Sequence, residues 1–186
     1  YNAESIVLRH AEFTGNRSNS GTGTTSGAVA IYGGGATIEN CTFTDNIVTR
    51  FLSFGGAIRF DRMTGDTVIR NSAFNGNKAV HGSAVHWVPT SQQARTMEHT
   101  SFTGNTKPGT AGSGPNDADP WGAAITVYEL TQLRLDGVSF QNNALDTSGY
   151  AAWDIDLDDT TAFRNITTIQ KLSAAYLLNV KNSTQF

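Results

Sequence analysis

The sequence predicts an all-β protein folded as a right-handed parallel β-helix, a solenoid in which each full turn of the chain, called a coil below, stacks on the next. The first observation is that the pattern Phe-x-x-Asn occurs five times, at intervals of 30, 31, 28 and 38 residues, beginning at Phe13, Phe43, Phe74, Phe102 and Phe140. The second is that the residues before each Phe have the same character in every unit, and the third is a short apolar motif that follows each unit. A repeat of this length is typical of stacked arrays, and crossovers between parallel strands are nearly always right-handed.

An antiparallel sandwich is the main alternative fold, but its turns would come about every 8–12 residues in hairpin pairs. We therefore expect a single array over residues 1–186, with about five to six coils of roughly 28–38 residues and three short strands in each. The expected coils lie near residues 6–34, 35–65, 66–93, 94–131, 132–160 and 161–186. The sequence starts and stops within a repeat, which favours a segment of a longer protein.

The first strand of each coil is expected to end at a corner. Five positions before each Phe stands an apolar residue that should face inward: Leu8, Ile38, Ile69, Met97 and Leu135. The next residue is charged and should face water, because side chains alternate along a strand: Arg9, Glu39, Arg70, Glu98 and Asp136, with Arg164 continuing the column. The corner follows at residue types that tolerate left-handed backbone: His10, Asn40, Asn71, His99 and Gly137.

The second strand carries each Phe. Small side chains should point inward beside the rings, at Ala11, Cys41, Ser72, Thr100 and Val138. The rings should stack inside the solenoid, and the Asn that closes each pattern should form a ladder of amides bonded from coil to coil: Asn16, Asn46, Asn77, Asn105 and Asn143. Each such hydrogen bond contributes about 0.5–1.5 kcal/mol net, and each buried Phe contributes about 1.5–3 kcal/mol.

A third strand is expected at GAVAI from Gly27, GAIRF from Gly56, SAVHW from Ser83, AAITV from Ala123 and AAWDI from Ala151. Its inward pairs would be Val29/Ile31, Ile58/Phe60, Val85/Trp87, Ile125/Val127 and Trp153/Ile155, and its outward row would be Ala30, Arg59, His86, Thr126 and Asp154. A decayed sixth coil would place Phe163 in the apolar position of the first strand and start its third strand at Ala174. Val180 is the candidate start of a seventh.

The composition excludes several classes of protein. A net charge of -3 and the absence of any run of Lys or Arg argue against a nucleic-acid partner. No apolar stretch is long enough to cross a bilayer, so no transmembrane segment is expected in this chain. The single Cys41 excludes an internal disulfide and every multi-Cys metal site, and it should be a small buried side chain.

Coil length varies between the last Asn of each pattern and the third strand, at Arg17–Ser26, Ile47–Gly55, Lys78–Gly82, Thr106–Trp121 and Ala144–Tyr150. Loops that vary at one corner are how solenoids carry their specific surface. The longest of them is therefore the expected site of contact with partners.

The alternation of FxxN with GGAI-like strands resembles the repeats of the chlamydial polymorphic outer membrane proteins, and it is similar more broadly to β-helical, autotransporter-like passenger regions. The resemblance covers about 170 residues. Gly56-Ala57-Ile58 matches the strand motif well, whereas Ser83-Ala84-Val85 and Ala151-Ala152-Trp153 depart from it. The resemblance implies a secreted, cell-surface or outer membrane-associated protein with adhesive or structural work.

An enzyme of the β-helix class, a polysaccharide lyase or hydrolase, would carry charged side chains on the outward face of one sheet. The candidates are Arg59, His86 and Asp154. His86 and Asp154 would stand two strands apart, about 10 Å, which is too far for direct proton transfer. No single coil offers the close carboxylate pair of a glycosidase. We therefore expect solvated strand positions and no enzymatic activity.

Acidic residues could surround a Ca²⁺ ion, which takes six to eight oxygen ligands. The candidates are Asp117 and Asp119 of the long loop with Asp154, Asp156, Asp158 and Asp159 of the WDIDLDD stretch. Their spacing matches no known Ca²⁺ loop, so a solvated acidic edge without a cofactor is the expectation. The alternating signs of the charged column predict cross-strand ion pairs that support the register.

N-glycosylation sequons occur at Asn16, Asn40, Asn165 and Asn182. They are compatible with a glycosylated surface protein but are frequent by chance in a chain rich in Ser and Thr. At Asn16 a glycan would compete with stacking of the amide ladder.

We expect a non-enzymatic β-solenoid that spaces, adheres or assembles outside the cell. Neither end of the sequence has a recognisable polar cap, and open coils invite pairing. The expected partners are therefore other protein chains or copies of this chain at the open ends, with surface glycans as candidate ligands.

Overall fold

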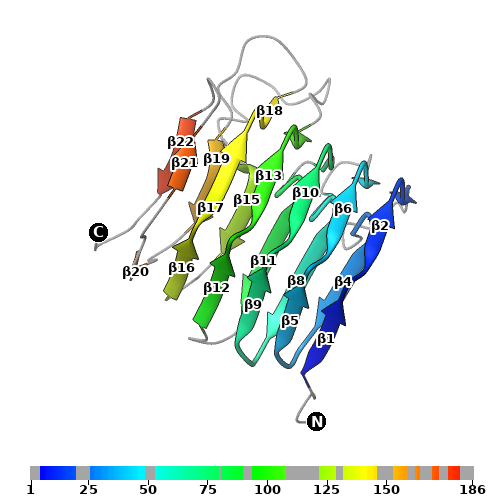
Figure 1. Cartoon of the computed structure of the whole chain (residues 1–186), viewed down its shortest axis with the longest axis vertical. Coiled ribbons are helices and arrows are strands. Elements are labelled where there is room, and N and C mark those ends of the chain that lie inside the picture. Colours follow the sequence, from blue (N-terminus) through cyan, green and yellow to red (C-terminus); the bar gives the residue numbers. More distant parts are fainter. Residues whose placement is uncertain are drawn as a thin grey trace.

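The computed structural model is all-β, and none of the residues that it describes is helical (Figure 1). The structure describes residues 5–19, 26–48, 53–79, 81–89, 94–107, 122–128, 132–145, 153–158, 162–163, 169–171 and 176–180. Side chains are described in residues 5–19, 26–48, 53–79, 81–88, 94–106, 124–126 and 134–143.

Three six-stranded sheets take one strand each from successive coils. The first sheet contains β1 (Ile6–Arg9), β5 (Ala36–Glu39), β9 (Thr67–Arg70), β12 (Ala94–Glu98), β16 (Gln132–Asp136) and β20 (Ala162–Phe163). The second contains β2 (Glu12–Thr14), β6 (Thr42–Thr44), β10 (Ala73–Asn75), β13 (Ser101–Thr103), β17 (Val138–Gln141) and β21 (Ile169–Lys171).

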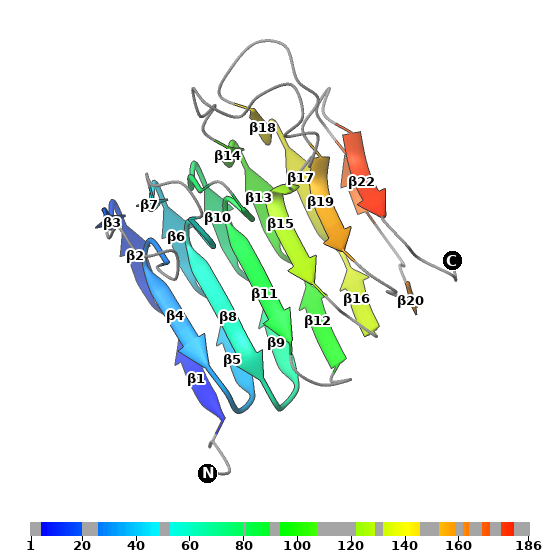
Figure 2. The same cartoon turned by 180° about the vertical axis from the view of Figure 1, so that it is seen from behind.

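The third sheet faces the viewer in Figure 2. It contains β4 (Val29–Tyr32), β8 (Ile58–Met63), β11 (Val85–Pro89), β15 (Gly122–Tyr128), β19 (Trp153–Asp158) and β22 (Tyr176–Val180). All pairings in the three sheets are parallel. The prediction of an all-β chain built from parallel sheets is therefore confirmed.

A fourth short strand segment, which the sequence analysis did not predict, follows the Asn of each pattern. Strand β3 (Arg17–Ser18) pairs with β7 (Ile47–Val48), and β14 (Thr106–Lys107) pairs with β18 (Ala144–Leu145). Single bridges from Lys78 to Ile47 and to Thr106 join these two pairs into one row. Two-residue segments of this kind are too short to show a period in the sequence.

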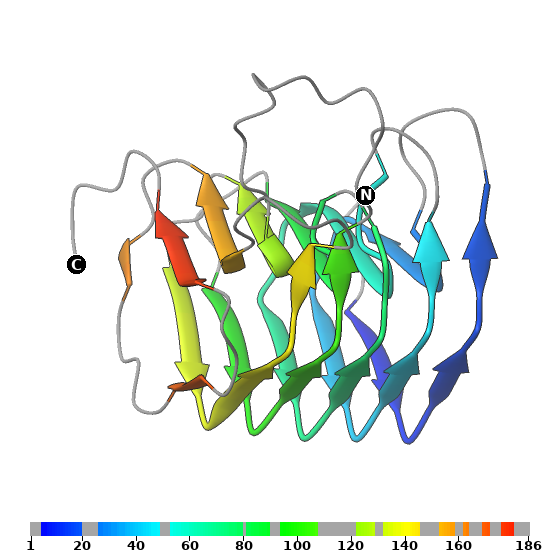
Figure 3. The ribbon, with the colours of Figure 1, turned by 90° about the horizontal axis from the view of Figure 1, so that it is seen from above.

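The corner between the first and second sheets is left-handed in each of the five coils where it is described, as predicted. The φ angles are 51° at His10, 53° at Asn40, 50° at Asn71, 46° at His99 and 62° at Gly137. These corners form the row of sharp bends along the lower edge in Figure 3. A second left-handed corner, which we did not predict, precedes the last Asn of each pattern, at Gly15, Asp45, Gly76, Gly104 and Asn142.

The core is the interior between the three sheets. The predicted inward residues of the first strand are buried from Ile38 to Leu135, and those of the third strand are buried from Ile31 to Ile125. The side chains of Val127, Trp153 and Ile155 lie outside the described set. Cys41 is a free, buried thiol, as predicted.

Arg95 is a charged residue in this interior, on β12 between its partners Thr67 and Leu133. Its Nη1 donates to the carbonyl oxygens of Gly65 at 3.1 Å and Ala94 at 3.0 Å. Burial lowers the pKa of the guanidinium from its usual value, although Asp66 opposes the shift. The guanidinium thus finds hydrogen-bond acceptors in backbone carbonyls despite its burial.

Two expectations of register are wrong. In β15 the pairing with β19 shifts between Gly122 and Ile125, so that Ile125 pairs with Ile155 and not with Trp153. In the sixth coil Phe163 pairs with Leu133, two residues before the Leu135 that we expected. Lys171 then occupies the register position of the stacked Phe, opposite Phe140. The candidate seventh coil after Val180 lies outside the described residues.

Candidate functional site

The outward row of the third sheet, the candidate catalytic position, is exposed at Ala30 but buried from Arg59 to Thr126. Ala30, Arg59, His86 and Thr126 pair in register across β4, β8, β11 and β15, as the sequence predicted. Arg59, His86 and Thr126 nevertheless have 6%, 1% and 0% of their surface exposed. The expectation of solvent-facing positions is therefore wrong for these three residues, and Phe54 lies against two of them, Arg59 and His86.

Two aromatic residues from the variable corner help to cover the row. Phe54 and His81 pair as an isolated bridge, and their rings stack with centroids 4.8 Å apart. The Phe54 ring also lies 4.6 Å from the ring of His86, and the guanidinium carbon of Arg59 lies 4.9 Å from its centroid. A cation over an aromatic face is stabilised more strongly when both groups are removed from water.

Arg59 is also neutralised within its own strand. Its Nη2 lies 2.8 Å from Oδ2 of Asp61, and the two side chains are only 8% and 10% exposed. Removing either partner from such a pair leaves a buried charge without its counter-ion, which is strongly destabilising. This contact gives Arg59 a structural role through Nη2, while its Nε and Nη1 are buried without a hydrogen-bond partner among the described residues.

His86 is held in its neutral form. Burial lowers its pKa well below the usual value for histidine, and electrostatic interactions with His81 and Arg59 lower it further. A catalytic acid or base must reach a proton of its substrate, at about 2.6–3.2 Å or through one water. A side chain with 1% of its surface exposed offers no such access in this conformation.

Asp154 does not continue the outward row. The register shift in β15 pairs Thr126 with Asp156, so Asp156 takes the place that we had given to Asp154. The side chains of both lie outside the described set, as does Asp158, and Asp117, Asp119 and Asp159 are not among the described residues. Within the described residues, no group of three or more His, Cys, Asp or Glu side chains is arranged to hold a metal ion.

Of the long loop Thr106–Trp121, the residues after Lys107 lie outside the described residues. In the described part of the chain, no helix is long and apolar enough to cross a membrane.

The Phe ladder follows the prediction. Consecutive rings from Phe13 to Phe140 stack with centroids 4.8, 4.9, 4.9 and 5.2 Å apart and planes within 9° of parallel. Phe13 is partly exposed, whereas the other four are fully buried.

The Asn ladder also follows the prediction, with more hydrogen bonds than expected. Each Nδ2 donates to Oδ1 of the Asn in the next coil, at 2.8 Å for Asn16, 2.9 Å for Asn46, 3.0 Å for Asn77 and 2.9 Å for Asn105. The same Oδ1 accepts a second bond from the backbone N–H of the preceding Asn. Each Nδ2 from Asn46 onward also donates to the carbonyl of the Phe one coil earlier.

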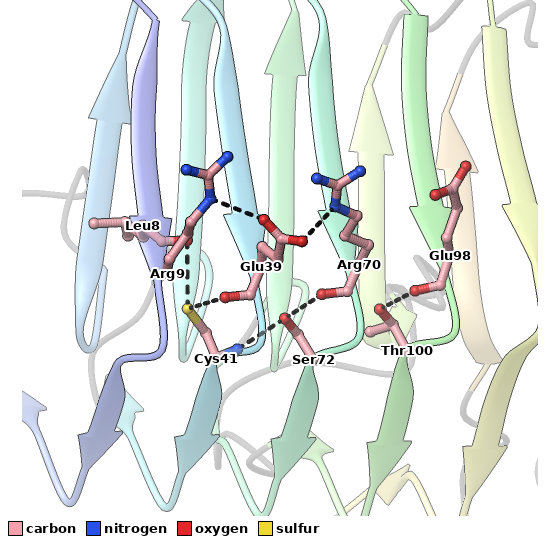
Figure 4. Close-up of polar contacts among 8 residues, drawn as sticks. All are labelled: Leu8, Arg9, Glu39, Cys41, Arg70, Ser72, Glu98 and Thr100. Atoms are coloured by element: carbon pink, nitrogen blue, oxygen red, sulfur yellow. Dashed lines mark hydrogen bonds and ion pairs between the residues drawn. The ribbon is translucent and has the colours of Figure 1, made fainter.

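The first three members of the charged column form ion pairs across coils, as predicted (Figure 4). Glu39 lies between Arg9 at 2.8 Å and Arg70 at 3.0 Å. Contact with Arg70, and then with Arg9, lowers the pKa of Glu39 from its usual value. Farther along, Arg134, two residues before Asp136, bridges Glu98 and Asp136 at 3.1 Å each. Arg164 lies outside the described residues.

The polar residues after each corner hydrogen-bond back across it (Figure 4). The hydroxyls of Ser72 and Thr100 donate to the carbonyls of Arg70 and Glu98 at 2.9 Å. The thiol of Cys41 approaches the corresponding carbonyl of Glu39 at 3.3 Å. These bonds satisfy the hydroxyls of Ser72 and Thr100 at a position where Ala11 and Val138 are apolar.

The sequons fall at different kinds of position. Asn16 is exposed, but its amide is hydrogen-bonded to Asn46 in the ladder. Asn40 is exposed at a left-handed corner. Asn165 and Asn182 lie outside the described residues.

The stacked aromatic pair Phe54 and His81 was missed in the sequence. A signal was present, because each stands before a glycine with positive φ, Gly55 at 61° and Gly82 at 56°, just ahead of the third strand. The shared aromatic-Gly spacing could have aligned them in one row.

No protein-family model, no curated protein and no solved structure matches this chain.

Proposed function

We propose that this chain is a segment of a non-enzymatic, right-handed parallel β-helix of about five to six coils, which serves as a structural, adhesive or assembly module at the cell surface or outside the cell. The observation that supports this most is the buried amide ladder. Four consecutive Asn side chains, from Asn46 to Asn143, are fully buried and bonded to one another and to the backbone. These amides stabilise the fold, and their hydrogen bonds within the ladder do not favour a catalytic role.

The right-handed sense rests on the strong preference of parallel crossovers. The number of coils rests on the repeat spacing and on the strands that pair in each sheet. The location outside the cell rests on the resemblance of the Phe-x-x-Asn and Gly-Gly-Ala-Ile motifs to surface-protein repeats.

A polysaccharide lyase or hydrolase is the alternative. It is less well supported because Arg59 is paired with Asp61 and covered by Phe54. His86 is buried and neutral beside them. An enzyme of this class would need this face of the sheet to be open to a sugar chain.

The two functions can be separated with purified protein. We would incubate it with acidic and neutral polysaccharides, with and without Ca²⁺, and measure both product formation and retention on the immobilised glycans. The proposal expects no turnover, whether or not glycan is retained. Turnover that is abolished by Asp154→Ala or Asp156→Ala would replace the proposal with the enzyme.

The location is tested separately in cells that make the parent protein. Protease applied to intact cells should remove an epitope within this segment, with an internal protein as the control. An epitope that is cleaved only after permeabilisation would contradict a place at the surface.

A further inference from the structure

Arg95 belongs to a column of inward-facing positions that runs through neighbouring coils. It lies on β12 in register with Thr67 on β9, and Thr67 is in register with Ala36 on β5, the next strand of the same sheet (Figure 1). Thr67 and Arg95 each stand two residues before a core residue, Ile69 and Met97 respectively, so they point to the same face of the sheet. With 0% and 1% of their surface exposed, both are enclosed in the interior between the three sheets.

The hydrogen bonds of this guanidinium are incomplete. Both bonds of Nη1 go to backbone carbonyls, those of Gly65 and Ala94. Nη2 lies 3.5 Å from the carbonyl oxygen of Met63, which is longer than the usual N–H···O separation of about 2.7–3.2 Å. Nε is buried and has no hydrogen-bond partner among the described residues. A buried donor in this state has lost the water that it binds in the unfolded chain and has gained no acceptor in return.

The charge of Arg95 also lacks a close counter-ion. Within the described part of the chain, no carboxylate forms an ion pair with it. Asp66 acts on it electrostatically, but Asp66 is exposed and its Oδ1 accepts the backbone N–H of Ala94 at 3.2 Å. Arg59, which is also buried, has Asp61 at 2.8 Å. Because arginine keeps its proton in proteins, the charge of Arg95 calls for a negative partner.

Thr67 supplies a second donor beside this charge. Its Oγ1 is buried and makes no hydrogen bond to any of the described residues. Positions in register on adjacent parallel strands lie about 4.8 Å apart, so one acceptor can lie within reach of both Thr67 Oγ1 and Arg95 Nε. A hydroxyl rotates freely to donate, and Nε always donates. Two donors and a positive charge therefore converge from two successive coils.

We propose that Arg95 and Thr67 bind a small monovalent anion of the halide type in the interior between β9 and β12. The anion accepts hydrogen bonds from Nε of Arg95 and Oγ1 of Thr67, and it neutralises the guanidinium. A water molecule would accept the same bonds but would leave the charge uncompensated. A divalent oxyanion would bring more charge and more acceptors than these two side chains match. The ion links one coil to the next, and the inference goes beyond the proposed function without depending on it.

The first test is a chloride titration of the purified ¹⁵N-labelled chain. The protein is unfolded and refolded in sodium gluconate, whose anion is too large for the interior, and chloride replaces gluconate at constant ionic strength. The Nε–H signal of Arg95, assigned through bonds, should shift and saturate. Urea unfolding should show a parallel gain. At a chloride concentration ten times the dissociation constant, the folding equilibrium constant should be about elevenfold higher than in gluconate.

Thr67→Val separates anion binding from a purely structural role. The change removes the hydroxyl and keeps the shape of the side chain. It should weaken chloride about tenfold or more, because a hydrogen bond to an ion is lost. In gluconate the variant should be at least as stable as the native chain, since the hydroxyl has no partner there among the described residues. Thr126→Val is the matched control, because Thr126 is equally buried with an unbonded hydroxyl but lies in the third sheet, and it should leave the chloride affinity unchanged.

The position of the ion is tested in crystals of the chain refolded in bromide. An anomalous peak should lie within hydrogen-bond distance of both Arg95 Nε and Thr67 Oγ1. A peak found only elsewhere, or a water without anomalous signal at this place, would overturn the inference. So would a stability that is equal in chloride and gluconate, or an undiminished chloride affinity in Thr67→Val. Should Thr67→Val fail to fold, the titration and the bromide position in the native chain still decide. None of these results bears on the proposed non-enzymatic function, which the turnover and location experiments test.

Discussion

The side-chain amide of Asn46 donates a hydrogen bond to Oδ1 of Asn77 at 2.9 Å, and both residues are fully buried. The same Oδ1 accepts the backbone N–H of Asn46 at 3.1 Å, and Nδ2 of Asn77 donates onward to Asn105 at 3.0 Å. One side chain thus satisfies polar groups of both neighbouring coils, so the ladder ties each coil to the next.

Replacing Asn77 by Ala should destabilise the chain by roughly 2–5 kcal/mol, because several buried donors and acceptors lose their partners at once. Asn16→Ala is the matched control at the exposed end and should cost about 0.5–1.5 kcal/mol. Urea unfolding followed by circular dichroism measures both. Equal losses at the two positions would mean that burial of the ladder contributes little.

Phe74→Ala should cost about 3–5 kcal/mol, since a fully buried ring that stacks on two others leaves a cavity. Phe13→Ala should cost much less, because this ring has one stacked neighbour and is partly exposed. Thermal unfolding of the two variants side by side gives the comparison. A larger loss of stability for Phe13→Ala than for Phe74→Ala would contradict the burial of Phe74 between two stacked rings.

Gly56→Ala should prevent folding or cost about 4 kcal/mol or more, as a Cβ there would stand 2.0 Å from the carbonyl oxygen of Ser83 in the next coil. Gly104→Asn is the control, because its site has no atom within 4 Å and Asn142 adopts the same left-handed corner one coil later. That variant should change stability by no more than about 1 kcal/mol. Soluble expression and melting temperature are the readouts, and a native-like Gly56→Ala would show that the coils are not in close contact there.

Acid should destabilise the protein through His86. Its pKa in the folded state lies well below 6.5, so below that pH the unfolded chain binds more protons than the folded one. The stability contributed by neutral His86 is therefore present above about pH 6.5 and is lost as the pH falls from there towards the folded-state pKa. Unfolding free energies measured from pH 8 to pH 5 should decline, and the decline should be smaller in His86→Gln.

The groups that face His86 define the control for this experiment. The Phe54 ring lies against it at a tilt of 52°, the His81 ring lies 6.5 Å away, and Arg59 adds positive charge from the adjacent strand. His99 is exposed at a corner, and His99→Gln serves as the matched control for the exchange of one histidine for glutamine. A profile that is unchanged in His86→Gln would assign the acid sensitivity to other groups.

Where neighbouring coils repeat the same residue types, the sequence predicts the structure closely. The Phe and Asn columns and the left-handed corners at Asn40 and Asn71 follow because a parallel stack places equivalent positions beside one another. The second row of corners was missed although Gly15, Asp45 and Asn142 are residue types that tolerate it.

Register failed where the repeat weakens. The shift between Gly122 and Ile125 moved Asp156 into the place expected for Asp154, and nothing in the alternation of polar and apolar residues there marks an irregular strand. In the sixth coil Phe163 was aligned by its apolar character, but the neighbouring strand pairs it two residues away.

Burial of the outward row could not be predicted from the strand pattern alone. Arg59 and His86 alternate with inward residues, and by that rule they face water. Their burial depends on the path of the variable corner, which brings Phe54 and His81 over the sheet. A tertiary contact of this kind has no period within the sequence.

The stacking of equivalent residues in parallel register from coil to coil underlies both the fold and the proposed function. Nitroxide labels on the outward positions Thr42, Ala73, Ser101 and Ser139 test it directly, in a Cys41→Ser background, because these residues pair in sequence across β6, β10, β13 and β17. Electron paramagnetic resonance of label pairs with Thr42 as the fixed member should show an interaction that weakens steadily, with the separation rising by about 4.8 Å for each coil. A separation that fails to grow in this order, or a stronger interaction between Thr42 and Ser139 than between Thr42 and Ala73, would contradict the stacked arrangement.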